Sequence, residues 1–255
     1  MSTGSVQELA VGTRSRGGSQ RPARLASIVV EELAREIIGG QLPEGSPLPV
    51  EEVLCKRFGF SRTVMREGLK VLEERGLILV EQGRGTTVQP RESWNLLDPD
   101  VLRIALEYDH DMVLLDDLVG LRRLLESTMV LVAATRMSEE ELAALELNID
   151  RMAIAMHEDF RQFDQYDAAF HVMLMTASRS EIGRMVVRAF RQYTSEHHVL
   201  SSPCSRESMK RTVADHRAIH EALVNRDGEL AAARMTAHID LSWTEKRSRS
   251  KAATD

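Results

Sequence analysis

Residues 61–76, SRTVMREGLKVLEERG, carry signals at both ends that define one short helix. The first residue, a serine, is a preferred N-cap, and the last, a glycine, stands where a helix is expected to stop. Between them, apolar side chains recur on one face, whereas Arg62, Arg66 and Lys70 follow at four-residue spacing on the opposite face. The segment therefore predicts an amphipathic helix that packs by one face and presents a line of cations by the other.

The flanking segments place this helix within a larger unit. Two helical patterns, at 25–38 and 50–59, precede it, and each ends at glycine. An alternating stretch at 77–90 follows it and folds back around a Gly-Arg-Gly tip, as a β-hairpin does. Helix, helix, turn, helix and hairpin are the elements of a winged helix-turn-helix, in which the third helix enters the major groove of DNA.

The cations of the 61–76 helix are therefore candidates for DNA contact. Arginine side chains can reach base edges or phosphates in the major groove, and arginine is the commonest reader of guanine. The alternative is a solvated helix face on which these cations pair with Glu67, Glu73 and Glu74. DNA binding is favoured because cap, turn, apolar stripe and wing occur together and in order.

Charge is unevenly distributed along the chain. The net charge of −6 would oppose DNA binding if it were spread evenly. Residues 1–90, however, hold 12 Lys and Arg against 11 Asp and Glu, so the acidic excess lies in the remainder. Residues 14–24 hold four Arg and no acid, which predicts a flexible basic arm over 1–24 that either stays solvated or contacts the DNA backbone.

The rest of the chain is patterned for helices. Only 4% of residues are aromatic, while Leu, Ala, Val and Met are frequent, a balance that favours helices over strands. The predicted fold class is mostly α, with an N-terminal winged helix-turn-helix and a C-terminal antiparallel α-helical bundle. The predicted domains are the arm, a DNA-binding domain at 25–90, an ordered connector at 91–111, the bundle at 112–246 and a tail at 247–255. The helices expected in the bundle are 111–136, 138–157, 159–177, 180–199, 206–225 and 228–246.

Four side chains of the bundle form a candidate metal site. Asp167 and His171 lie four residues apart and share one face of a helix. His216 and His238 each lie eleven residues from Asp227, so a hairpin turn there brings them to the same height. Three imidazoles and one carboxylate suit Zn²⁺ first, with Ni²⁺ and Mn²⁺ as alternatives.

Other histidines have a simpler interpretation. A single histidine in a helix is more often solvent-facing or a satisfied core group than a metal ligand. This interpretation applies to His110, His157, His197 and His198. His220 lies four residues after His216 on the same face, so it is an alternative ligand or a hydrogen-bond partner of the site.

The cellular compartment of the protein is indicated by the absence of a CxxC motif and of a signal peptide in the sequence. Cys55 and Cys204 have no CxxC spacing, and no signal-peptide h-region follows the polar first residues. The most apolar stretches, such as STMVLVAA at 127–134, are too short to span a bilayer. The sequence predicts a cytoplasmic protein without a membrane segment.

The segment 48–88, LPVEEVLCKRFGFSRTVMREGLKVLEERGLILVEQGRGTTV, resembles the DNA-binding domain of the GntR family of bacterial transcription regulators. The resemblance implies that Arg62, Thr63 and Arg66 contact bases and phosphates and that Gly83, at the wing tip, enters the minor groove. Glu52 stands where many members carry an arginine that contacts DNA, so that contact is not carried over. The full set of predicted DNA-binding residues is Arg62, Thr63, Arg66, Lys70, Gly83 and Arg84.

The segments LRRLLES at 121–127, DAAFH at 167–171 and DHRAIHEALVNRDGELAAARMTAHI at 215–239 resemble the metal-holding branch of the FadR subgroup of that family. This resemblance implies an all-helical ligand-binding domain in which Arg122 is a partner for an effector carboxylate. It also implies the metal ligands Asp167, His171, His216 and His238. The connector WNLLDPDVLRIALE at 94–107 looks like that of regulators of galactonate and related sugar-acid catabolism, which makes a sugar acid the first effector to test.

The predicted function is that of a transcription regulator, most simply a repressor. It would bind operator DNA as a homodimer and sense a small organic acid through its metal-containing bundle. A metalloenzyme is the alternative from another class, but no HExxH element and no evident general base accompany the ligands. A third hypothesis makes the metal itself the signal.

Overall fold

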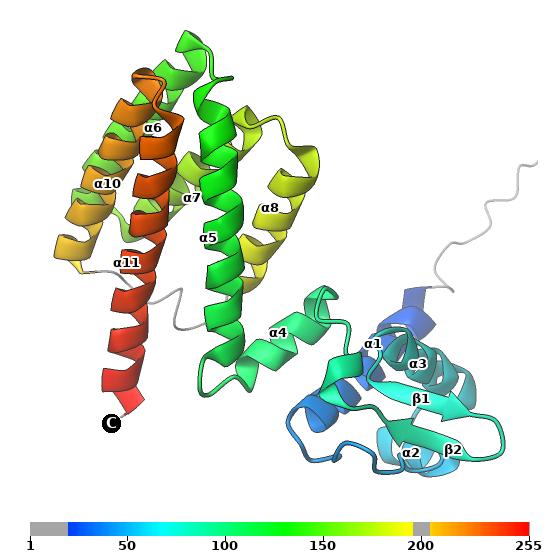
Figure 1. Cartoon of the computed structure of the whole chain (residues 1–255). Helices are drawn as coiled ribbons and strands as arrows, with labels where there is room; N and C mark the ends of the chain where they lie inside the picture. The colour runs from blue at the N-terminus through cyan, green and yellow to red at the C-terminus, as the bar shows by residue number, and fades with distance from the viewer. Residues whose placement is uncertain (1–19, 196–204, 255) are drawn as a thin grey trace, which may run out of the picture. The chain divides into compact units, whose positions relative to one another are not determined.

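The computed structural model describes residues 20–195 and 205–254, and these form two compact units that meet in sequence between Tyr108 and Asp109 (Figure 1). Each unit has its own buried apolar cluster. Over these ranges the fold is mostly helical, with one two-stranded sheet, as the sequence predicted. Within the same ranges, no helix is long and apolar enough to cross a membrane.

The first unit is a winged helix-turn-helix with one additional helix. Its hairpin pairs β1 with β2 in antiparallel register, Ile78 opposite Val88 and Glu81 opposite Gly85. The Ser61 hydroxyl caps α3 by accepting the Val64 amide, as expected from the sequence. The elements are α1 (Gln20–Ile38), α2 (Glu51–Phe58), α3 (Arg62–Glu74), β1 (Ile78–Glu81), β2 (Gly85–Val88), a 3₁₀ turn η1 (Arg91–Ser93) and α4 (Pro99–Glu107).

Gly76 ends α3 for a steric reason as well as a conformational one. Its φ of 73° lies in the left-handed region that favours glycine. A Cβ atom at this position would also overlap the carbonyl oxygen of Ser93. The glycine therefore lets the end of η1 pass directly over the C-terminal end of α3.

Two boundaries of the first unit differ from the prediction. α1 begins at Gln20, so the end of the predicted flexible arm is helical, and residues 1–19 lie outside the described residues. The predicted connector contains α4, whose Val101 and Ile104 belong to the winged-helix core. Its start is set by Asp98, whose carboxylate accepts the amides of the next two non-proline residues.

The second unit is a bundle of long helices around an apolar core. α11 packs beside both α5 and α10, and α6 packs against α7 (Figure 1). The elements are α5 (Val113–Ala134), α6 (Glu139–Glu158), α7 (Phe160–Ala177), α8 (Glu181–Ser195), α10 (Arg206–Val224) and α11 (Gly228–Thr254). These correspond to the six helical patterns of the sequence.

The predicted C-terminal tail is instead a continuation of α11 to Thr254. Two contacts to Asp116, on α5, support this extension. The indole Nε1 of Trp243 donates to Asp116 Oδ1 at 2.7 Å, and Arg247 forms an ion pair with the same carboxylate. The periodicity of the sequence does not reveal this pairing, because Asp116 lies more than one hundred residues away.

Candidate metal centre and DNA-reading face

Three helices of the bundle bring one acid and three histidines together. Asp167 and His171 project from α7, His216 from α10 and His238 from α11, and one ligand atom from each lies within 4.8 Å of all the others. The three imidazoles are buried, whereas Asp167 is half-buried. The cluster is the group that the sequence singled out as candidate metal ligands.

The spacing of the donor atoms fits a small metal ion. His216 Nε2 lies 3.4 Å from His238 Nε2 and 3.5 Å from Asp167 Oδ1, and His171 Nε2 lies 3.9 Å from the same oxygen. A tetrahedral zinc ion with Zn–N distances near 2.0–2.1 Å separates its ligand atoms by about 3.3 Å. The residues therefore fit such an ion without a large rearrangement.

The helical hairpin explains why the two C-terminal histidines meet. α10 ends at Val224 and α11 begins at Gly228, so His216 and His238 are almost equally far from the turn, as their spacing predicted. Phe170 stacks on the His216 ring with centroids 3.7 Å apart and planes inclined by 7°. This apolar wall limits water around the imidazole and fixes its plane.

Glu126 is a buried part of the site that the sequence analysis missed. Its Oε2 lies 2.5 Å from His171 Nδ1, and its Oε1 accepts a hydrogen bond of 2.7 Å from Arg122 Nε. Because a carboxylate only accepts hydrogen bonds, this contact places the imidazole proton on Nδ1. The lone pair of Nε2 then faces the cluster, where it could bind a metal ion. One indication of this role was present in the sequence: Glu126 lies four residues after Arg122, so the two side chains share one face of a helix.

Asp215 has the same relation to His238. Its Oδ2 lies 3.3 Å from His238 Nδ1, which leaves Nε2 of that ring directed toward His216. Asp215 directly precedes His216 in the chain, so one turn of α10 supplies both a candidate ligand and the carboxylate that orients its neighbour.

Arg122 lies against the cluster. Its Nη2 is 3.2 Å from His171 Nε2, and its guanidinium forms the ion pair with Glu126. Burial disfavours the charge on Arg122, but the carboxylates of Glu126 and Asp167 outweigh that effect and raise its pKa above the ordinary value. A permanent cation therefore stands at the edge of the candidate metal site.

The remaining histidines divide into three groups. His220 lies apart from the donor atoms, with its Nε2 3.1 Å from the Leu142 carbonyl oxygen, so the geometry favours His216 over His220 as a ligand. His110 and His157 are exposed. His197 and His198 lie outside the described residues.

The other candidate site is the face of α3 and the wing. Arg62 and Thr63 are exposed at the start of α3, and Gly83 adopts a φ of 80° at the exposed tip of the hairpin. Arg66 donates to Glu51 of α2 at 2.8 Å, and Glu52, the acid after it, pairs with Lys56 at 2.9 Å.

Pairing with acids of α3 itself, the alternative to DNA contact, accounts for little of this charge. Lys70 approaches Glu74 at 3.7 Å, and Glu73 accepts the amide of Val80. Arg84 pairs with Glu81 within the wing at 3.4 Å. In the described part of the chain, Arg62 makes no ion pair, and its side chain is exposed to solvent.

Comparison with known proteins connects both units to one kind of protein. Residues 25–88 match the family described as bacterial regulatory proteins, gntR family, and residues 117–241 match the FCD domain. The galactonate operon transcriptional repressor of Escherichia coli (strain K12) is 30% identical over 203 residues, which are 80% of this chain and 88% of that protein. The HTH-type transcriptional regulator LutR of Bacillus subtilis (strain 168) is 26% identical over 211 residues, 80% of this chain and 92% of the relative.

A solved structure supports the fold. The structure of Lar, from a study of the Listeria monocytogenes agr system, has a TM-score of 0.54 at 18% identity and covers 88% of this chain and 96% of that one.

The two units and these relatives define a DNA-binding transcription regulator rather than an enzyme. The chain belongs to the GntR family, in the FadR-like subgroup whose helical domain is of the FCD type. The family resemblance and the exclusion of an enzyme are thereby confirmed.

Proposed function

We propose that the chain is a repressor that binds operator DNA as a homodimer, holds a divalent metal and releases DNA when a small organic acid binds near that metal. The observation that carries the proposal is the convergence of Asp167, His171, His216 and His238 in the core of the bundle. Each of these side chains brings one ligand atom within 4.8 Å of the other three, and protein ligands that share one metal ion lie at such short spacing, so the cluster favours a bound metal.

The donor set indicates the kind of metal. Three imidazole nitrogens and one carboxylate oxygen suit Zn²⁺, with Ni²⁺ and Mn²⁺ as alternatives. When bound, such an ion supplies a Lewis-acid position that accepts a carboxylate oxygen. Arg122, a charged guanidinium beside His171, would bind the negative charge of the same acid by hydrogen bonds.

A sugar acid is the first effector that we propose. The E. coli relative is named as the galactonate operon repressor, and it aligns with four-fifths of this chain. Aldonates carry a carboxylate for the metal and Arg122 and hydroxyl groups for further hydrogen bonds. The name of that relative also supports repression as the direction of control.

The proposed function can be tested with purified, metal-loaded protein. Metal content is measured for wild type, His216→Ala and His220→Ala, which remove histidines one helical turn apart on α10. We expect loss of metal only for His216→Ala, because His220 bonds the Leu142 carbonyl rather than facing the cluster. Equal retention in both variants would exclude the proposed metal site.

The effector is sought by thermal shift against sugar acids, hydroxy acids and dicarboxylates, since a ligand of the native state raises the midpoint by mass action. The acid with the largest shift should release the protein from operator DNA. Release that follows metal concentration alone, with no dependence on any acid, would instead identify a metal-responsive repressor.

A further inference from the structure

We propose that Glu51 determines base preference by holding Arg66 in the orientation in which its guanidinium reads a guanine. The proposal rests on DNA binding through α3. Glu51 is the first residue of α2, and its Oε2 accepts a hydrogen bond of 2.8 Å from Arg66 Nε. Arg66 belongs to the outer face of α3, and Glu51 comes from the preceding helix of the helix-turn-helix.

The contact leaves the base-reading edge of Arg66 available. A guanidinium carries five N–H groups, and the Nε–H is the one that Glu51 accepts. The two terminal nitrogens form the planar fork that matches O6 and N7 of guanine. Because 69% of the Arg66 side chain is exposed, this fork can reach a base while Nε stays bonded.

Glu51 is well placed to act as a fixed support. Its side chain is 27% exposed, and a carboxylate in the first turn of a helix is stabilised by the amide groups there. The hydrogen bond to Glu51 also raises the pKa of Arg66 above its ordinary value. A long arginine side chain that is already oriented loses less conformational freedom when it binds a base.

The same carboxylate weakens attraction to DNA in general. Glu51 and Arg66 line one groove between α2, α3 and the wing, together with Lys70 and Arg84. Phosphate attraction depends on the summed charge of such a face and not on base sequence. Glu51 should therefore increase discrimination between sequences while reducing affinity for every sequence.

Glu52 provides a matched control. It is the next residue of α2 and carries the same charge, but its partner is Lys56 on its own helix, at 2.9 Å. Removal of either acid makes the DNA-reading unit less negative by one charge. Only removal of Glu51 releases Arg66.

The experiment uses the full chain and an operator selected by wild type from random double-stranded DNA. Relative affinities for this operator and for each of its single-base-pair variants are measured at one salt concentration. The proteins are wild type, Arg62→Ala, Arg66→Ala, Glu51→Ala, the isosteric Glu51→Gln and Glu52→Ala, each checked for an unchanged thermal midpoint.

We expect wild type to lose about tenfold affinity or more when the guanine read by Arg66 is replaced. Arg66→Ala should abolish the preference at that base pair, and Glu51→Ala should reduce it to about threefold or less. Glu51→Gln should retain an intermediate preference, because its amide oxygen still accepts from Nε. Glu52→Ala should keep the wild-type preference, and both alanine variants of the acids should bind unrelated DNA more tightly.

Three results would overturn the inference. One is an unchanged preference profile in Glu51→Ala, and another is a sharper preference, which would make Glu51 a competitor of DNA. The third is a uniform loss of affinity in Arg66→Ala, which would assign Arg66 to a phosphate. All three leave operator binding through α3 intact, whereas unchanged affinity in both Arg62→Ala and Arg66→Ala would remove α3 as the reading helix.

Discussion

His171 lies between two carboxylates, one from a candidate metal ligand and one from a residue that would orient the ligands. Asp167 stands one helical turn before it, and Glu126 fixes its other ring nitrogen from α5. Carboxylates in the latter position commonly change metal affinity by about 10–100-fold when they are removed. Replacement of Glu126, which is buried and lies outside the four donors, should therefore weaken the proposed site.

Glu126→Gln should lower zinc affinity by about 10–100-fold. The amide is a weaker acceptor than the carboxylate, so His171 is no longer held with its proton on Nδ1, and Arg122 loses its counter-ion. The measurement is competition with a chelator of known zinc affinity. Asp117→Asn, an exposed acid on the same helix, is the control, and equal zinc affinities for the two variants would contradict the role given to Glu126.

The candidate ligands were predictable from sequence for a local reason, and their supports were not. Asp167 and His171 share one turn, and His216 and His238 are symmetric about one hairpin, so spacing predicted that each pair would meet, whereas the choice of His216 over His220 came from the family resemblance. Glu126 meets His171 across 45 residues of sequence, and no periodicity encodes that contact. The structure also changes how Arg122 should be tested, since Arg122→Ala leaves a buried carboxylate without its cation whereas Arg122→Lys retains the charge.

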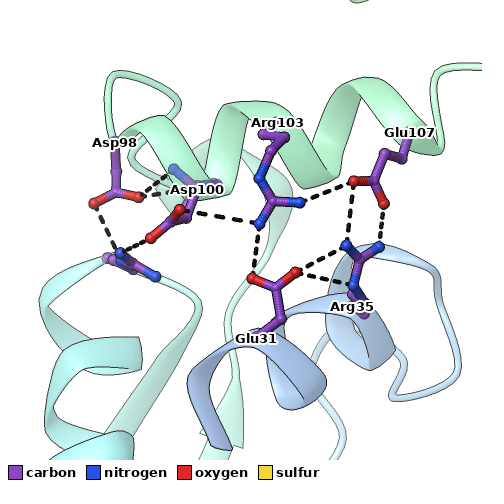
Figure 2. A network of polar contacts seen from close by, with 8 residues as sticks. Glu31, Arg35, Asp98, Asp100, Arg103 and Glu107 are labelled. Atoms are coloured by element: carbon purple, nitrogen blue, oxygen red, sulfur yellow. Dashed lines mark hydrogen bonds and ion pairs between the residues drawn. The ribbon is translucent and has the colours of Figure 1, made fainter. Parts of the chain in front are cut away.

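At the scale of elements, α4 is tied to the winged helix by a network of ion pairs (Figure 2). Arg103 of α4 reaches Glu31 of α1 at 2.7 Å and Glu107 on its own helix at 2.9 Å. Glu107 in turn pairs with Arg35 of α1, which also binds Glu31 at 2.8 Å. At the other end of the network, Arg75 binds both Asp98 and Asp100.

The sequence did not predict α4 as a helix because this short helix is stabilised by contacts with residues distant in sequence. Nine residues are too few for a stable helix on propensity alone, and most of the stabilisation of short helices comes from tertiary packing. Val101 and Ile104 supply that packing, and the ion pairs align the polar side of α4 with α1. The longer helices, by contrast, were evident from repeated apolar spacing, and the mostly α fold with its wing was predicted correctly.

Glu107→Gln should destabilise the winged-helix unit by about 0.5–1 kcal/mol near neutral pH, a small value because the pair is partly exposed. Burial raises the pKa of Glu107, but hydrogen bonds and charge from Arg35 and Arg103 outweigh it, so the pKa falls below its ordinary value of 4.5. A carboxyl whose pKa is lowered on folding stabilises the fold above the unfolded pKa, and this stabilisation is lost as pH falls through the folded one.

The difference between wild type and Glu107→Gln should therefore persist down to about the ordinary Glu pKa and then shrink in more acidic solution. Urea unfolding is followed in a Trp243→Phe background, in which the fluorescence of Trp94 reports on the winged-helix unit alone. Glu92→Gln, an exposed acid of η1, is the control. A difference that grows as pH falls would refute the stabilising role of the ion pairs.

At the scale of the whole molecule, the chain combines a unit that exposes cations on α3 with an acidic unit that contains a buried polar cluster. The order of these units could be predicted, because residues 1–90 are close to charge balance and the bundle carries the acidic excess. The energetic coupling between the units could not be predicted from the sequence, because it is a difference in free energy between two states of the protein. Only linked binding measurements give that quantity.

The last prediction concerns this linkage and rests on the proposed function. If the acid found by thermal shift weakens operator binding by some factor, operator DNA must weaken binding of the acid by the same factor, and ~5–150-fold is typical. Four dissociation constants are measured on metal-loaded protein at one salt concentration: operator with and without the acid, and acid with and without the operator.

Arg122→Lys should bind the free operator like wild type, because α3 and the wing are unchanged. It should need several times more acid for half-release, since lysine cannot bind a carboxylate through two parallel hydrogen bonds. Equal half-release concentrations in the two proteins would remove Arg122 from the effector site. A change in operator affinity without the acid would instead show that Arg122 supports the DNA-binding state itself.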